Sequence, residues 1–214
     1  MFVQYYDRPI PPPRRHPWTI VEDQPQLQYC NFREHPSETL EDFKPWTKYP
    51  AIPKFYKLLV WLNGPDSVFE TNDCALGEPY VDHATPPLVR QAFDKDPTTI
   101  HGRLTLIFRD LSWNVSRPHF DRLKLLVHDN LLHNVPNYPS VIYVGEWPHL
   151  FTAIDKEGHA LCLQFWAWGD DEALTFENLQ STFYTLLELF QYISGVAKGD
   201  QQSAGGGSLR ASPR

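Results

Sequence analysis

The chain contains few cysteines for its length. Its 214 residues include only Cys30, Cys74 and Cys162, which are widely spaced and form no C-x-x-C pair. A disulfide framework needs more cysteines, and a structural zinc site of cysteines needs closely spaced pairs. We therefore expect reduced thiols in a cytoplasmic protein that holds no metal and no other cofactor.

Long apolar stretches are also missing from the sequence. The longest runs, such as residues 58–62, are far below the roughly 20 apolar residues that span a bilayer. Residues 1–13 lack the apolar core of a signal peptide. We therefore expect a soluble protein with no membrane among its partners.

The short motifs that bind phosphates or mark an esterase are absent. The sequence contains no G-x-x-x-x-G-K, no G-x-G-x-x-G and no G-x-S-x-G. The glycines at 205–207 follow no strand pattern and open no helix pattern. These absences argue against nucleotide-dependent enzymes and against an esterase elbow.

Positive charge is scarce in the body of the chain. The net charge is -7, while residues 1–16 and residues 197–214 each carry +2, so residues 17–196 carry -11. Such an acidic body repels the phosphates of nucleic acids and anionic membranes. It suits a basic protein partner, although charge of this size also serves solubility alone. We expect no nucleic acid among the partners.

Aromatic residues and prolines, by contrast, are abundant. Aromatics make up 14% of the chain, hydrophobic residues make up 42%, and there are 20 prolines, most of them before residue 100. This composition is sufficient for a packed core. We expect a proline-rich irregular N-terminal arm (residues 1–54) that packs on the body, a single α+β domain (residues 55–196) and a disordered tail (residues 197–214).

The first regular pattern predicts strands. Residues 57–62 form an apolar run of strand length, residues 63–66 read Asn-Gly-Pro-Asp, and residues 67–71 return. A turn signal between two such runs predicts a β-hairpin. Alternation of apolar and polar residues over 104–108 predicts a further, half-buried strand.

A helix is predicted after this strand. Ser116 stands where a helix cap is favoured, Pro118 fits the first turn, and Pro136 ends the pattern. Three more strands are predicted over 141–144, 150–154 and 160–168, the last two joined by a short turn.

A second long helix is predicted near the end of the chain. Thr175 is the expected cap and Gly195 the expected stop. Its apolar residues recur on a spacing close to that of a coiled coil, which fits either a dimer seam or a stripe that rests on the sheet. We expect the stripe to be core and the protein to be a monomer or weak dimer.

The order of these elements predicts an α+β fold. We expect a two-layer sandwich with a mostly antiparallel sheet of about six strands and two main helices on one face. Three strands followed by a helix occur twice, so a duplicated βββα unit is possible. The segments LTLIF (104–108) and LCLQF (161–165) resemble each other, although chance explains that match about as well.

Residues 70–83 form the densest polar stretch, ETNDCALGEPYVDH. Carboxylates and a histidine on one loop can bind a metal or act as acid and base. Asp73, Asp82 and His83 are the candidate catalytic residues of such a metal-dependent or hydrolase-like enzyme. Ordinary turn chemistry, in which side chains bond to nearby backbone amides, explains the same residues.

A second candidate site follows from two tryptophans. In a strand, Trp166 and Trp168 share one face and Phe165 takes the other. Tryptophan is enriched at binding hot spots, and neighbouring acids can steer a basic partner. The acids that follow are Asp170, Asp171 and Glu172. The alternative is that the N-terminal arm covers this face and that the acids only favour the start of the last helix.

Two functional hypotheses therefore stand. The preferred one is a non-catalytic protein-binding domain, for example a small acidic immunity- or antitoxin-like partner of a basic protein. It depends on the tryptophan face and on the acidic body. The alternative is the enzyme built on residues 70–83, which requires those side chains to converge in one pocket.

Overall fold

The protein folds into an α+β structure built on one mixed sheet. The computed structural model describes residues 2–5, 14–16, 48–133 and 139–205. Within them, seven strands are ordered β1-β6-β7-β5-β3, with β2 also paired to β6 and β4 to β5. The strands are β1 (Phe2–Tyr5), β2 (Arg14–His16), β3 (Phe69–Leu76), β4 (Tyr80–Val81), β5 (Thr98–Phe108), β6 (Ser140–Phe151) and β7 (Lys156–Gly169). The helices are α2 (Ala51–Asn63), α3 (Pro87–Arg90), α4 (Leu111–Val115), α5 (Arg117–His133) and α6 (Glu172–Gly205).

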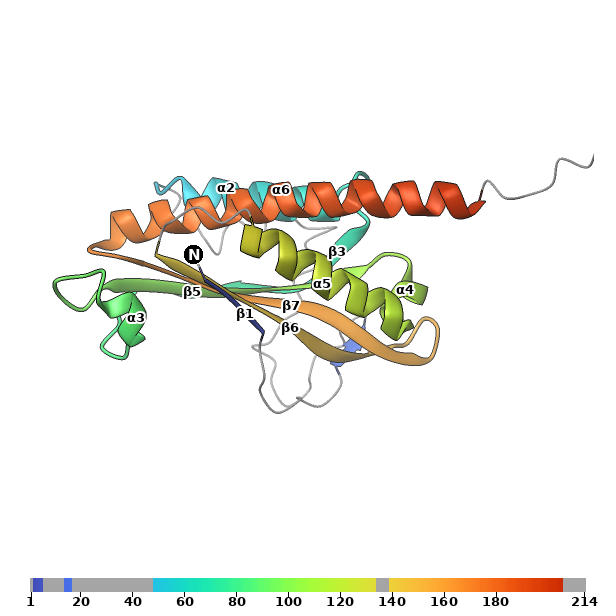
Figure 1. Cartoon of the computed structure of the whole chain (residues 1–214), viewed down its shortest axis with the longest axis horizontal. Coiled ribbons are helices and arrows are strands. Elements are labelled where there is room, and N and C mark those ends of the chain that lie inside the picture. Colours follow the sequence, from blue (N-terminus) through green and yellow to red (C-terminus); the bar gives the residue numbers. More distant parts are fainter. Residues whose placement is uncertain (1, 6–13, 17–47, 134–138, 206–214) are drawn as a thin grey trace, which may run out of the picture.

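The helices α2, α5 and α6 lie along one side of the sheet, and α3 lies on the other side (Figure 1). The main core fills the space between these three helices and the sheet. Its centre is aromatic, since the ring of Phe165 on β7 lies 6.3 Å from Phe55 of α2 and 5.3 Å from Phe183 of α6. Burying side chains of this size supplies the dominant favourable term in folding.

The two-residue period of the strands decides which side chains enter this core. On β5, Leu104 and Leu106 are fully buried toward the helices, and on β7 their cross-strand partners Leu163 and Leu161 are buried with them. Gly102 continues the same row. A Cβ atom there would lie 2.5 Å from the oxygen of Ala75 and 2.6 Å from the Phe165 ring, so only glycine fits.

The predicted hairpin over residues 57–71 is wrong, because residues 51–63 form the helix α2. Its buried residues recur three to four positions apart, as on one face of a helix. They are Ile52, Phe55, Leu58, Leu59 and Leu62. The period becomes visible only when residues before 57 are included, and Pro53 lies in the first turn, where proline is tolerated.

Asn63 closes this helix and ties it to the sheet. Its side-chain amide donates to the carbonyl of Leu59 at 2.8 Å and to the hydroxyl of Thr71 at 2.9 Å. Its side-chain oxygen accepts from the backbone N–H of Thr71 at 3.1 Å. The Asn-Gly turn signal was therefore correct, but it connects a helix to β3.

The second half of the chain follows its sequence pattern more closely. The helix predicted after Ser116 is confirmed as α5, and the hairpin of its last two strands is confirmed as β6 and β7. Residues 141–144 and 150–154 do not form two strands, because β6 runs continuously through Phe151. The described elements therefore do not repeat a βββα order.

The last helix starts earlier and ends later than its sequence signals. Asp171 caps it, since its carboxylate accepts from the N–H of Leu174 at 2.9 Å. Thr175 is fully buried inside the first turn, where its hydroxyl donates to the carbonyl of Asp171 at 2.7 Å. The helix passes Gly195 and continues to Gly205.

The α+β class is confirmed, and the antiparallel character is matched in part. The pairs among β3, β4, β5, β6 and β7 are antiparallel, whereas β1 and β2 both run parallel to β6. These two short strands belong to the predicted N-terminal arm, most of which (residues 6–13 and 17–47) lies outside the described residues. In the part of the chain that the structure describes, no helix has the length and apolarity needed to cross a membrane.

Candidate functional site on the second face of the sheet

The face of the sheet opposite α2, α5 and α6 carries the candidate functional residues. We call it the second face and define it by His101, Arg103 and Thr105 on β5 with Gln164 and Trp166 on β7. These residues alternate with the buried leucines of the main core, so the strand period places them there. Several of them remain half-buried or exposed.

An aromatic row crosses this face on four strands. Trp166 and its cross-strand partner His101 stack with ring centroids 6.0 Å apart and an interplanar angle of 19°. The ring of Tyr143 on β6 lies nearly perpendicular to that of Trp166, with centroids 5.2 Å apart, and Tyr80 of β4 lies in the same way against His101, with centroids 6.0 Å apart. Tyr80 is 44% exposed, and Trp166 and Tyr143 are half-buried. The row is therefore a solvent-accessible aromatic surface held in place by cross-strand pairs.

The two predicted tryptophans share the second face but differ in burial. Trp168 is only 2% exposed, because Val89 of α3 and Phe93 after it pack against it. Its indole N–H donates to the carboxylate of Asp82 at 3.3 Å. Of the two, Trp166 is therefore the residue that a partner can reach.

The three predicted acidic residues do not form one cluster with the tryptophans. Asp171 is the cap of α6, and Glu172 accepts a hydrogen bond from the hydroxyl of Tyr49. Asp170 is exposed at the end of β7. Two of the three therefore have structural roles at the start of α6, as the alternative interpretation expected.

A charged pair lies beside the aromatic row. The guanidinium of Arg103 donates to the carboxylate of Asp73 at 2.8 Å and 3.3 Å. Asp73 stands on the neighbouring strand β3, across from Thr105. Arg103 is 40% exposed and Asp73 13%, so the pair forms part of the surface and balances its own charge.

The candidate catalytic residues are not brought together. Asp73 faces Thr105 on β5, whereas the N–H of Asp82 bonds to the carbonyl of Pro97 at the opposite end of that strand. At roughly 3.3 Å per residue, this register separates them by about 25 Å. His83 pairs with Asp96 instead, at 2.9 Å. Residues 70–83 are also not one loop, because β3 and β4 occupy much of them.

The described ranges contain no group of three or more His, Cys, Asp or Glu side chains arranged to hold a metal ion. Cys74 is half-buried and Cys162 is buried. Cys30 lies outside the described residues.

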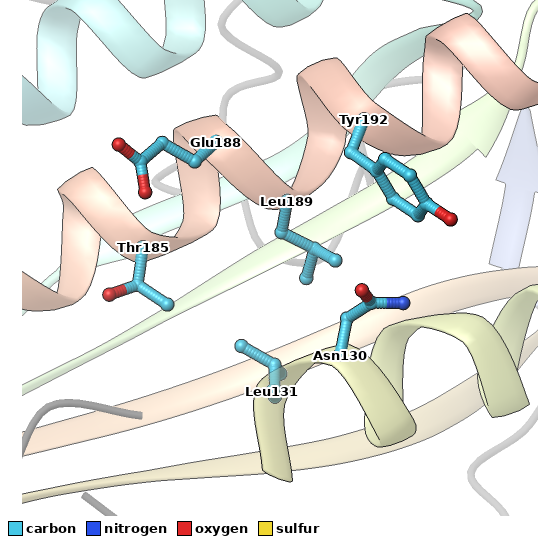
Figure 2. Close-up of a pocket in the computed structure, with 6 residues that line it drawn as sticks. All are labelled: Asn130, Leu131, Thr185, Glu188, Leu189 and Tyr192. Atoms are coloured by element: carbon cyan, nitrogen blue, oxygen red, sulfur yellow. The ribbon is translucent and has the colours of Figure 1, made fainter. Parts of the chain in front are cut away.

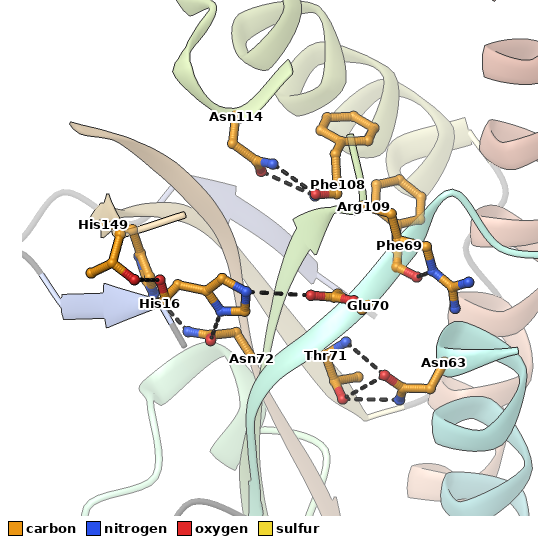
Figure 3. A network of polar contacts seen from close by, with 11 residues as sticks. His16, Asn63, Phe69, Glu70, Thr71, Asn72, Phe108, Arg109, Asn114 and His149 are labelled. Carbon is orange, nitrogen blue, oxygen red and sulfur yellow. Dashed lines mark hydrogen bonds and ion pairs between the residues drawn. The ribbon is translucent and has the colours of Figure 1, made fainter. Parts of the chain in front are cut away.

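A polar chain lies at the far end of the second face (Figure 3). It joins Glu70 and Asn72, from the polar stretch 70–83, to two histidines that the sequence did not connect with them. His16 of β2 contacts Glu70 and Asn72 of β3 at 3.4 Å and 2.9 Å. Asn72 continues to His149 of β6 at 2.6 Å, and His149 bonds to the carbonyl of Trp147 at 3.0 Å. Asn72 is 2% exposed and His149 is fully buried, so every link in this chain matters energetically.

This polar chain requires a curved sheet. In the sheet order, β7 and β5 lie between β6 and β3, a separation of about 14 Å in a flat sheet. The contact between Asn72 and His149 shows that the end of β6 approaches β3 across the second face. A bulge between Thr71 and Asp73 accompanies this approach.

Burial and pairing act in opposite directions on His16. Burial, the largest single influence, lowers the pKa of the His16 ring, but the hydrogen bonds to Glu70 and Asn72 together raise it above its ordinary value. The ring also packs against Phe151, with centroids 5.9 Å apart. The structure therefore favours the charged form of a mostly buried imidazole.

A separate pocket of about 580 Å³ lies between α5 and α6, on the helical side of the molecule (Figure 2). Leu131 and Leu189 lie at its centre, and the rest of its lining is polar. The remaining lining residues are Asn130, Thr185, Glu188 and Tyr192. Its size suits a small ligand, but it contains none of the residues that the sequence singled out.

Comparisons with known proteins add no further assignment. No family model, no curated protein and no solved structure matches this chain.

Proposed function

We propose that the chain is a non-catalytic protein-binding domain that uses the second face as its contact surface. One observation carries the proposal: the row of Tyr143, Trp166, His101 and Tyr80 lies partly in solvent across four strands. Aromatic surface of this kind gains free energy when a partner covers it. Trp166 stands at the middle of the row, where hot-spot residues concentrate.

The charge of the molecule favours a basic partner. Residues 17–196 carry a net charge of -11, and the exposed acids Glu78 and Asp170 lie at the same end of the sheet as Tyr80 and Trp168. Acidic groups at the rim of an apolar patch accelerate encounter with a positively charged surface. We infer an immunity- or antitoxin-like role, in which a soluble cytoplasmic domain covers a basic protein as a monomer or weak dimer.

The test is to purify the tagged full-length protein from its native cells and to identify stoichiometric partners by mass spectrometry. The identified partner is then titrated against wild type, Trp166→Ala and Tyr192→Ala. Tyr192 is a matched control, because it is an aromatic residue that is 54% exposed on the helical side. We expect Trp166→Ala to weaken binding by about 30-fold or more, the effect of a hot-spot residue, and Tyr192→Ala to change it little.

Several outcomes would contradict the proposal. Equal affinity of wild type and folded Trp166→Ala would remove the second face from the interface. A loss of affinity with Tyr192→Ala alone would place the contact on the helical side. A purified protein without any stoichiometric partner, or with one that binds independently of salt, would remove the basic-partner assignment.

A further inference from the structure

The polar chain at the far end of the second face joins three separate segments of the protein. His16 comes from β2, Glu70 and Asn72 come from β3, and His149 comes from β6. Four contacts run in series, from the Glu70 carboxylate through His16, Asn72 and His149 to the carbonyl of Trp147. Both ends of the series, an ionised carboxylate and a carbonyl, can only accept hydrogen bonds.

The number of protons in this chain follows from its ends. Each outer contact needs an N–H from a histidine ring, one from His16 and one from His149. The side-chain amide of Asn72 accepts with its oxygen and donates with its nitrogen, so it can donate in only one of the two inner contacts. The other inner contact therefore needs a third ring proton. Two neutral imidazoles carry one proton each, so one ring must be an imidazolium.

This count does not depend on how the amide of Asn72 is oriented. With the side-chain oxygen of Asn72 toward His16, as found, the fully bonded chain requires Nδ1 and Nε2 of His16 both to donate, and it requires one ring proton on His149. Exchanging the oxygen and nitrogen of Asn72 would transfer the extra proton to His149 and leave the total unchanged. The fully bonded chain thus holds one proton more than two neutral rings.

We propose that the chain Glu70–His16–Asn72–His149 is a proton-operated clamp, which fastens β2 to the sheet when protonated and releases it when the extra proton is lost. Removing that proton leaves two acceptors facing each other at one contact of a buried network. The clamp does not depend on what binds the second face.

The strand β2 has little else to hold it among the described contacts. It spans only three residues, paired in parallel with 149–151 of β6. The carbonyl of His16 accepts from the backbone N–H of Thr152 at 3.1 Å and from its hydroxyl at 2.9 Å. Because β2 is this short, a side chain that reaches across to β3 contributes a large share of its attachment.

Among the described contacts, Glu70 is the carboxylate that pairs with His16, and the other charged groups nearby are paired elsewhere or exposed. On β3, the other carboxylate of this face, Asp73, is paired with Arg103. On β6, His149 faces the ring through Asn72. At the end of β7, Lys156 and Glu157 pair with Phe151 and Leu150 of β6 and are exposed, as is the neighbouring Arg15 on β2 itself.

The expected pH range follows from the direction of the pKa shift. The pKa of His16 is raised above its ordinary value of 6.5. Because the pKa is raised in the folded protein, the clamp is fully closed at pH values below 6.5, the pKa of this histidine in the unfolded chain. It opens as the pH rises through the pKa of the folded protein. The device therefore holds β2 more firmly in acid than in mildly basic solution.

The first test follows the imidazole nitrogens of the full-length, 15N-labelled protein by NMR across the histidine titration range. We expect one of His16 and His149 to titrate above 6.5 while the other stays neutral. In Glu70→Gln the carboxylate is replaced by a neutral amide, so the titration should fall to a lower pH. Glu157→Gln, which neutralises an exposed acid of the same region, is the matched control and should leave it unchanged.

The second test measures attachment of β2 directly by hydrogen exchange. The protection factor of the Thr152 amide should fall as the pH rises. The total fall should be about tenfold for each unit by which the pKa of the ring lies above 6.5. The amide of Gly77, which bonds to the carbonyl of His101 at 2.8 Å in a distant part of the sheet, should keep its protection. In Glu70→Gln the fall should begin at lower pH.

The proposal would be overturned by two neutral rings below pH 6.5, since the chain would then lack its third proton. It would also be overturned by Thr152 protection that stays constant while the ring deprotonates. If Glu70→Gln does not fold, the wild-type titration and exchange data decide by themselves.

Discussion

The two faces of the sheet are built from neighbouring residues with opposite properties. On β7, Leu163 and Phe165 are fully buried beneath the helices, while Gln164 and Trp166 between and beside them remain half-buried on the second face. A step of one residue along the strand therefore changes a side chain from core to surface. The main hydrophobic core belongs to one face, and the exposed aromatic row belongs to the other.

This contrast separates what stabilises the protein from what is available for recognition. The helix-covered face contains a continuous core joined to α2, α5 and α6. Among the residues that the structure describes, the second face has two small apolar clusters, around Trp168 and around Phe151, with polar groups between them. Substitutions on the first face should lower stability, and substitutions on the second should chiefly alter binding and pH response.

The largest effect is expected from Phe165→Ala. The ring is fully buried and contacts both Phe55 and Phe183, so its removal should leave a cavity and cost about 3–5 kcal/mol of unfolding free energy. Chemical denaturation followed by far-UV circular dichroism measures this loss. Trp166→Ala, one residue later and half-buried, should cost about 1–2 kcal/mol. Equal losses for the two variants would contradict the division between the faces.

A smaller effect is expected at Glu146, a charged residue among the apolar side chains of the helix-covered face. Its carboxylate accepts from Lys124 at 2.8 Å and Arg117 at 3.0 Å, both on α5. Burial, the largest influence, raises the pKa of Glu146, but the two cations outweigh it and lower the pKa below its ordinary 4.5. The stabilisation from Glu146 is therefore fully present at pH values above 4.5, and it is lost as the pH falls through the pKa that Glu146 has in the folded protein.

The variant Glu146→Gln should therefore lose about 1 kcal/mol near neutral pH and show a shallower loss of stability in acid. Denaturant midpoints across a pH series measure both quantities. Asp170→Asn, which neutralises an exposed acid, serves as the control. An acid slope as steep in Glu146→Gln as in wild type would show that the α5 ion pairs contribute nothing.

The smallest effect is expected from Arg103→Ala on the second face. The pair that Arg103 forms with Asp73 is partly in solvent, and such pairs contribute less than about 1 kcal/mol. Arg109, also an arginine at the β5 region, donates instead to the carbonyls of Phe69 at 2.9 Å and Gly64 at 2.7 Å. Arg109→Ala should therefore cost more, about 2 kcal/mol. Thermal unfolding of both variants at low and high salt measures the two losses of stability. A larger and more salt-sensitive loss in Arg103→Ala than in Arg109→Ala would contradict this prediction.

The sequence predicted the regions whose pattern is local and long. The alternation over 104–108, the strand and turn pattern before and within 160–168, and the cap signals near Ser116 lead to β5, β7 and α5. Both tryptophans were assigned to one face because a strand fixes the direction of alternate side chains. The failure at α2 has an equally local cause, since five apolar residues (58–62) before a turn signal do not distinguish a strand from part of a helix.

The polar chain lies beyond the reach of such patterns. His16 and Asn72 are 56 positions apart, and Asn72 and His149 are 77 positions apart. Nothing near any of these residues indicates the partner, because the contact depends on the curvature of the sheet and on a bulge in β3. The burial of Trp168 depends in the same way on α3, a four-residue helix, because no local pattern indicates that this helix packs on Trp168.

The sequence by itself determined the α+β class, the direction of alternate side chains on the central strands and the acidity of the body, because each follows from composition or from a repeat of a few residues. Only the tertiary structure decided that Trp166 is reachable and Trp168 is not, that Asp73 and Asp82 lie at opposite ends of β5, and that two distant histidines share a chain with one extra proton. These features depend on how the strands pair and curve. Contacts between segments far apart along the chain cannot be recognised from the residues around either segment.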